Sequence, residues 1–131
     1  MPQGVLFQAG GKIDLDASFS IGADAGTTIA VGIQFKDRLS GNVMGEAVAV
    51  PWYFSSDAAG QVIATAGSGG VAIGTDGFLI EWTADLSGLM ISEADGDVDI
   101  VITEAGALDM YLNLVMPNGR IVTSSIISFS A

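Results

Sequence analysis

The chain contains neither cysteine nor histidine among its 131 residues. Without cysteine there is no disulfide framework, no thiolate nucleophile and no thiolate-bound metal. Without histidine the usual general base, the common serine-hydrolase triad and most transition-metal sites are also missing. Few enzyme mechanisms operate when histidine and cysteine are both absent. We therefore expect a protein that is not an enzyme and that holds no cofactor.

Positive charge is also scarce. Four basic residues stand against fifteen acidic ones, which gives a formal net charge of −11. Binding to nucleic acid or to an anionic membrane surface needs clustered Lys and Arg, so we expect neither as a partner. The longest apolar run, at residues 48–54, is far shorter than the roughly 20 residues of a spanning helix. Because the N-terminal residues also lack the pattern of a secretion signal, we expect a soluble protein with no export signal.

What the chain does contain is apolar residues and glycine: half of the residues are hydrophobic and 18 are glycine. Apolar and polar side chains alternate in short stretches, which is typical of half-buried strands. These stretches, separated by Gly, Asp and Asn turns, lie at 12–21, 29–36, 47–54, 61–65, 78–82, 97–103, 109–115 and 120–129. No segment has a helical period. The pattern predicts one all-β domain, an immunoglobulin-like two-sheet sandwich, with a small β-barrel as the alternative.

The same alternation predicts the core. The expected core residues are Ile29, Val31, Ile33, Phe35, Val48, Trp52, Phe54, Ile80, Trp82, Ile100, Leu112, Leu114 and Phe129. Pro51 has no N–H, so its strand is predicted to lie at a sheet edge or to carry a bulge. With Trp52 and Trp82 pointing inward, Tyr53 is the one aromatic of this group expected on the surface, which is weak support for a sugar-binding platform.

The N-terminal region predicts a contact with another molecule. Residues 1–26 are interpreted as an arm and a first strand, and residues 27–131 as a complete sandwich. The arm carries several apolar residues that an isolated strand cannot shield from water, and strand addition to a neighbour would bury them. The predicted interface residues are Val5, Leu6, Phe7, Ile13 and Leu15. Deleting residues 1–21 is accordingly expected to leave a folded domain that no longer binds its partner.

Acidic residues near position 95 suggest one possible metal site. Asp95, Asp97 and Asp99 offer alternate carboxylates that suit calcium. An EF-hand loop counted from Asp95 needs Gly and Glu where the chain has Ile100 and Gly106, so that motif fails. We favour an acidic turn that leads into an exposed strand face. Two of the other carboxylates could in principle act as the acid and nucleophile of a glycosidase. Because any acidic protein contains such pairs, this is no evidence for that activity.

A set of short sequence motifs also resembles those of a known family. They are Ser56-Asp-Ala-Ala-Gly60, residues 69–77 (GGVAIGTDG), residues 91–97 (ISEADGD), Thr103-Glu-Ala-Gly106, Tyr111-Leu112 and Pro117-Asn-Gly119. In this order and spacing, over about residues 27–131, the chain resembles immunoglobulin-like head decoration and head-fibre-type virion proteins of tailed bacteriophages. Leu108 stands where the tyrosine of an immunoglobulin tyrosine corner would be, so that feature is not expected.

The resemblance implies a role rather than a chemistry. It implies a capsid decoration or cement protein that lies on the outer surface of the capsid in the virion and stabilises the head. The implied partners are the major capsid protein and further copies of the chain, as a homotrimer, and no catalytic residues are carried over. The alternative is a tail or fibre module that binds glycans on the host surface.

Overall fold

The computed structural model describes residues 14–130, whose regular structure is entirely β-strand. The strands are β2 (Leu15–Ile21), β3 (Thr28–Asp37), β4 (Ala49–Ser55), β5 (Gly70–Ile73), β6 (Phe78–Thr83), β7 (Ser87–Ile91), β8 (Asp97–Thr103), β9 (Leu108–Val115), β10 (Ile121–Thr123) and β11 (Ile127–Phe129). Residues 14–130 include no helix of the length and apolarity needed to cross a membrane.

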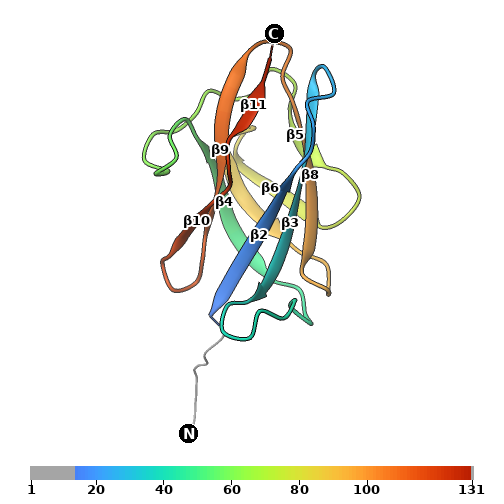
Figure 1. The fold of residues 1–131 in the computed structure, drawn as a ribbon, viewed down its shortest axis with the longest axis vertical. Coiled ribbons are helices and arrows are strands. Elements are labelled where there is room, and N and C mark those ends of the chain that lie inside the picture. The colour runs from blue at the N-terminus through green and yellow to red at the C-terminus, as the bar shows by residue number, and fades with distance from the viewer. Residues whose placement is uncertain (1–13, 131) are drawn as a thin grey trace, which may run out of the picture.

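Two antiparallel sheets pack face to face (Figure 1). One has the strand order β2-β3-β8-β5, and the other has the order β10-β9-β4-β7-β6, with β11 also paired to β9. The sheets do not close into a barrel. The predicted all-β two-sheet sandwich is therefore confirmed, and the barrel alternative is not the fold.

The strand positions correspond to those of an immunoglobulin variable-type sandwich. The smaller sheet repeats the A-B-E-D order, and the larger one repeats the G-F-C order with two further strands beside C. Trp52 is buried on β4, which takes the position of strand C, where immunoglobulin domains also bury a tryptophan. The chain order departs from that fold in two ways. The strand β5, in the D position, precedes the β6–β7 hairpin instead of following it, and within the hairpin the outer strand β6 precedes β7, the strand beside β4.

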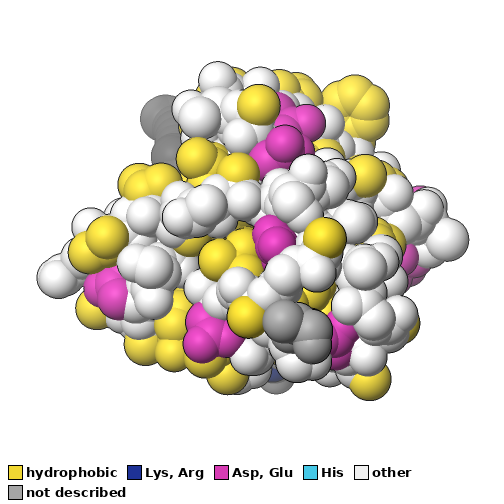
Figure 2. Space-filling model, turned by 90° about the horizontal axis from the view of Figure 1, so that it is seen from above, with side chains coloured by type: hydrophobic (Ala, Val, Ile, Leu, Met, Phe, Trp, Pro, Cys, Tyr) yellow, Lys and Arg dark blue, Asp and Glu magenta, His cyan; other side chains and the backbone are white. Residues whose placement is uncertain are grey.

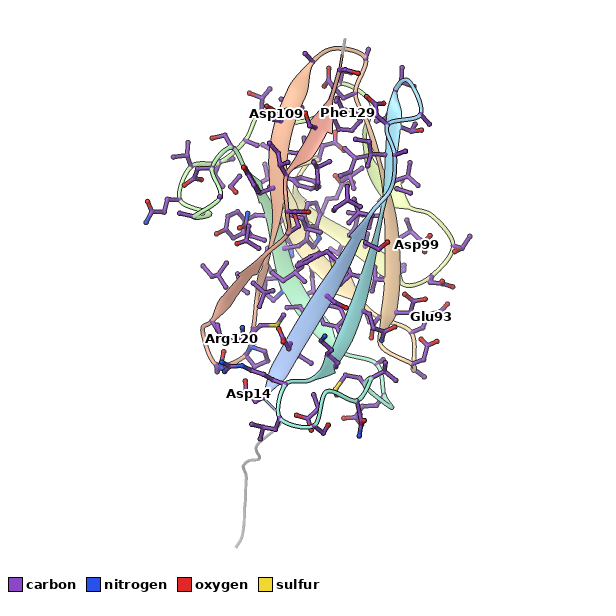
Figure 3. All side chains as sticks on the ribbon, in the orientation of Figure 1. Asp14, Glu93, Asp99, Asp109, Arg120 and Phe129 are labelled. Atoms are coloured by element: carbon purple, nitrogen blue, oxygen red, sulfur yellow. The ribbon has the colours of Figure 1, made fainter. Side chains whose placement is uncertain are left out.

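The core lies between the sheets and is built from one face of each strand (Figure 3). Every predicted core residue on β3, β8, β9 and β11 is buried, as are Trp52 and Phe54, whereas Val48 is only partly buried. The prediction is wrong for Ile80 and Trp82, which are exposed. Alternation shows which residues share a face but not which face is covered. On β6 the inward residue is Leu79, which pairs with Met90 of β7 and packs against the core.

The prediction of an edge position for Pro51 is also wrong, because β4 lies inside the larger sheet between β9 and β7. Pro51 pairs with Leu89 of β7, but the pairing of β4 with β9 starts only at Trp52. A residue without an N–H is therefore tolerated within an internal strand. The strand predicted at residues 61–65 is reduced to a single bridge between Ser55 and Ile63.

The strand β2 is an integral part of the sandwich. All seven of its residues pair with β3, and the side chain of Leu15 is only 4% exposed. Leu15, predicted as an interface residue, is thus buried against the core of its own sandwich, and Leu15–Ile21 pairs with β3 along its whole length. The other predicted interface residues, Val5, Leu6, Phe7 and Ile13, lie outside the described residues.

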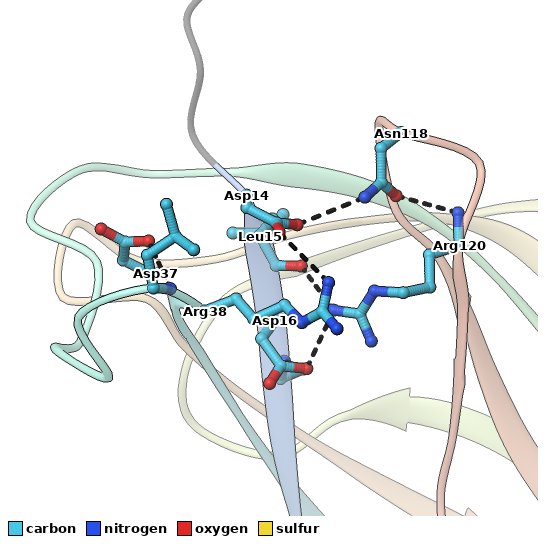
Figure 4. Close-up of polar contacts among 9 residues, drawn as sticks. Asp14, Leu15, Asp16, Asp37, Arg38, Asn118 and Arg120 are labelled. Atoms are coloured by element: carbon cyan, nitrogen blue, oxygen red, sulfur yellow. Dashed lines mark hydrogen bonds and ion pairs between the residues drawn. The ribbon is translucent and has the colours of Figure 1, made fainter.

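Polar contacts fasten the start of β2 to both sheets (Figure 4). The Arg120 guanidinium, from the turn before β10, donates to the Leu15 carbonyl at 3.0 Å and to Asp16 Oδ1 at 3.3 Å. Arg38 and Asn118 each donate to the Asp14 carboxylate at 3.2 Å. These contacts occupy backbone and side-chain acceptors at the free edge of β2, which discourages strand addition there.

Candidate docking surface

The outer face of the larger sheet carries a group of apolar side chains. The strand register places Phe78 beside Ile91 and Ile91 beside Ala49, and in the next row Ile80 beside Leu89 and Leu89 beside Pro51. Residues paired in an antiparallel ladder point to the same side of the sheet. We call these six residues the apolar face: Ala49, Pro51, Phe78, Ile80, Leu89 and Ile91.

The apolar face is open to solvent at its β6 border. Phe78 is 58% exposed and Ile80 is 37% exposed. Trp82, which is 62% exposed, lies at a β-bulge in β6 and has no paired residue on β7. The only charged residue of β6, Glu81, alternates to the opposite side, where its carboxylate accepts the N–H of Asp85. The apolar face itself carries no charge, although the whole chain carries a net charge of −11.

The rest of the same outer face is covered by the chain itself. The loop that follows β4 folds back over it, and the Tyr53 hydroxyl donates to the Gly60 carbonyl at 2.6 Å. Gly60 has a φ of +72°, and a side chain there would collide with Asn113. Beneath the loop, Asn113 is fully buried, donates to Ser55 Oγ at 2.8 Å and accepts from Thr123 Oγ1 at 2.7 Å. The sheet is thus covered over β9 and left bare over β6 and β7.

The outer face of the smaller sheet is polar by contrast. Its outward residues include Asp16, Ser18, Ser20, Gln34, Lys36, Asp97 and Asp99. A depression of about 180 Å³ lies above Gly32, between Ser18, Gln34 and Asp97. Acidic side chains are also spread among uncharged ones over the end of the sandwich seen in Figure 2. Other exposed apolar side chains of residues 14–130, such as Leu39, Val43, Val62 and Ile63, lie outside the named strands. The bare part of the larger sheet is the sheet face on which paired strands present apolar side chains side by side.

The three aspartates considered for calcium do not assemble into a metal site. No group of three potential ligand residues within positions 14–130 is arranged to hold a metal ion. Asp99, labelled with Glu93 in Figure 3, instead accepts the backbone N–H groups of Thr75 and Asp76 and the Thr75 hydroxyl. Its role is to hold the turn between β5 and β6 against β8.

The pKa values of two neighbouring aspartates on β8, Asp97 and Asp99, are shifted in opposite directions. Partial burial raises the pKa of the Asp97 carboxyl, and the nearby carboxylates of Asp76, Asp95 and Asp99 raise it further. Partial burial also acts to raise the pKa of Asp99, but the hydrogen bonds from Thr75 and Asp76 outweigh it, and the pKa of Asp99 is lowered. Ionisation of Asp97 therefore lowers the free energy of unfolding, whereas ionisation of Asp99 raises it.

We expect Asp97→Asn and Asp99→Asn to change stability with opposite sign at neutral pH. Asp97→Asn removes a disfavoured charge and raises the free energy of unfolding, while Asp99→Asn weakens the turn and lowers it, each by about 1 kcal/mol or less at these solvent-accessible sites. The stabilisation by Asp99 is complete above the ordinary value of 3.8 and is lost as the pH falls through its lowered pKa. The cost of Asp97 is instead relieved as the pH falls through its raised pKa.

Urea unfolding of both variants and the parent chain, at neutral pH and near pH 3, measures these effects. The difference between the parent chain and Asp97→Asn is expected to shrink in acid. Equal stability changes of the same sign in the two variants would contradict the assignment.

The sequence signal for the apolar face is the alternation of apolar residues in β6. This alternation predicts Ile80 and Trp82 in the core, whereas the structure leaves both side chains exposed together with Phe78. Tyr53, expected to be exposed, is half-buried and bound to Gly60, whereas Trp82, expected in the core, is exposed.

The fold and this surface define a class of protein, a β-sandwich with a bare apolar sheet face. No model of a known protein family matches the chain, and a search of curated proteins finds no match to it.

Proposed function

We propose that this chain is a non-enzymatic virion protein that decorates the outer surface of a phage head and stabilises it. The observation that supports the proposal is the apolar face, an uncharged patch on a strongly acidic molecule. Burying apolar surface contributes about 25 cal/mol per Å², so a sheet face of this kind is a source of binding free energy. The phage assignment itself comes from the sequence resemblance.

The expected partner is the major capsid protein. A decoration protein stabilises a shell when it binds the assembled lattice better than free subunits, because binding shifts the assembly equilibrium by mass action. A shell presents many identical sites, so a modest interface at each one is sufficient. The acidic remainder of the surface keeps bound copies soluble and limits contacts away from the apolar face.

The test is binding of the purified chain to shells that lack it, measured by co-sedimentation. Ala49→Asp places a charge in the apolar face at an exposed position distant from the free edge of β6. We expect shell affinity to fall about 10-fold or more, because an unpaired charge buried at an interface costs several kcal/mol and 1.4 kcal/mol is tenfold.

Ala72→Asp is the matched control. Ala72 is an exposed residue on β5, at the outer face of the other sheet, and the substitution is chemically identical. This variant is expected to bind shells as the parent chain does. Unchanged binding by Ala49→Asp, or equal losses in both variants, would exclude the apolar face as the docking surface.

A second candidate function is a tail or fibre module that binds host surface glycans. The exposed positions of Trp82 and Phe78 favour it, since sugar rings stack on exposed aromatic side chains. Labelled antibody on purified virions, viewed by electron microscopy, separates the two candidates: label on heads supports decoration, and label on tails supports the glycan module. Tryptophan fluorescence titrated with host surface polysaccharide is the matching solution test, because Trp82 lies at the proposed site.

A further inference from the structure

The strand β6 is a free sheet edge. Within residues 14–130 it pairs only with β7, and its other side has no strand beside it. Folded proteins usually protect such edges with short strands, charges, prolines, β-bulges or caps. The other edges follow this rule: β10 has three residues, β5 has four residues and donates the Val71 N–H to Asp85, and β2 is capped by Arg120. The edge β6 has a bulge and one charge, Glu81, at its C-terminal end, but Phe78 and Ile80 in the rest of the strand are exposed apolar residues.

The apolar residues of β6 are symmetric about Ile80. The sequence Phe78-Leu79-Ile80-Glu81-Trp82 has an aromatic residue two positions before and two positions after the isoleucine. A two-fold contact uses the same patch on both partners, so a patch must complement itself. If two copies pair antiparallel with Ile80 opposite Ile80, then Phe78 of each copy lies near Trp82 of the other, at the bulge in β6. Cross-strand aromatic pairs are among the favourable pairs in antiparallel sheets.

Charge favours the same register. Pairing centred on Glu81 would set two carboxylates opposite each other, which is unfavourable. Centring on Ile80 sets each Glu81 opposite Leu79 of the other copy, and the Glu81 carboxylate is already engaged by the Asp85 N–H of its own chain. Two chains of net charge −11 repel one another, so a contact between copies requires an uncharged surface. The side of the β6 edge that bears Phe78 and Ile80 is such a surface, because Glu81 points to the other side of the sheet.

We propose that two copies of the chain associate through β6 in an antiparallel, two-fold arrangement centred on Ile80. The two larger sheets then form one continuous sheet across the contact, and the two apolar faces lie side by side on its outer surface. The inference does not depend on a role in the virion, because the pair forms from the isolated chain.

Sedimentation equilibrium of the full chain, with Ile80→Lys and Ile80→Asp, tests the proposal. The parent chain is expected to reach twice the mass of one chain with rising concentration. Each variant alone is expected to weaken dimerisation at least tenfold, because like charges then lie opposite each other. An equimolar mixture of the two variants is expected to restore the dimer, because Lys and Asp then face each other across the axis.

Ile121→Lys is the control, since Ile121 is an exposed isoleucine on the opposite edge strand β10. It is expected to dimerise as the parent chain does. A parent chain that stays monomeric, a trimer that Ile80→Lys leaves intact, or a mixture of Ile80→Lys and Ile80→Asp that fails to recover the dimer would overturn the proposal.

A single cysteine gives a second measurement that does not depend on added charge. The chain has no cysteine, so Ile80→Cys introduces its only thiol. Directly opposed residues of antiparallel strands have Cα atoms about 4.5–5.5 Å apart, which lies within the range that a disulfide spans. Mild oxidation is expected to convert Ile80→Cys to a covalent dimer much faster than Ile121→Cys. Equal, slow cross-linking of both variants would also overturn the proposal.

Discussion

Replacing Trp52 by alanine is expected to lower the free energy of unfolding by about 3–5 kcal/mol. Trp52 is 1% exposed on the central strand β4, and its ring meets Phe54 edge-on with the ring centroids 5.5 Å apart. Its removal leaves a large cavity between two sheets whose strands are fixed by backbone ladders and cannot collapse into the space. Chemical denaturation of the parent chain and Trp52→Ala measures the loss.

Trp82→Ala is the matched control, because it removes the same side chain from an exposed position. It is expected to change the free energy of unfolding by less than about 1 kcal/mol, at a concentration where the chain is monomeric. Trp52→Phe refines the comparison. The indole Nε1 has no hydrogen-bond partner among the described residues, so this substitution reduces the volume of the side chain without removing a hydrogen bond. Similar losses in Trp52→Ala and Trp82→Ala would show that the core is placed incorrectly.

Deleting residues 1–21 is expected to abolish cooperative folding, in contrast to the expectation from sequence. The deletion removes β2, and with it seven paired positions and the buried Leu15 and Ala17 side chains. It also uncovers the edge of β3, whose inward residues include Phe35. Near-UV circular dichroism and the urea unfolding transition report the loss.

Deleting residues 1–13 is the comparison, because every described strand and the contacts of Asp14 remain. This shorter deletion is expected to keep the unfolding transition of the parent chain. A chain lacking residues 1–21 that still unfolds cooperatively, with the parent's dependence on urea concentration, would show that β3 and the rest of the sandwich do not need β2.

Much of the fold could be predicted from the sequence because apolar and polar residues alternate with a period of two in a half-buried strand. In β3, Ile29, Val31, Ile33 and Phe35 alternate with smaller or polar residues, and all four are buried as expected. The Gly and Asn turns predicted between the strands include Pro117-Asn-Gly119, where Gly119 adopts a positive φ of 87° that glycine accepts without strain. Composition also excludes any chemistry that needs a histidine or cysteine side chain, because the chain has neither.

The candidate surface could not be predicted in the same way. Ile80 and Ile33 occupy similar alternating patterns, but Ile33 faces the opposite sheet whereas Ile80 lies on the outer side of a sheet edge. The missing N–H of Pro51 predicts a strand at the edge of a sheet. The strand β4 is instead internal: Pro51 is paired with β7 on one side, and only its side toward β9 is unpaired. In both cases the local sequence pattern does not show which strands lie beside the residue, and those strands determine its exposure and pairing.

The sequence by itself determined the class of fold, the positions of most strands and the absence of histidine and cysteine, because these depend on local periodicity and on which residue types are present. Only the tertiary structure decided that β2 completes the sandwich, that Trp52 is buried while Trp82 is exposed, and that one half of a sheet face is covered by its own loop. The physical reason is that a strand has two faces and two edges, and only the strands and loops packed around it decide which of these meet water.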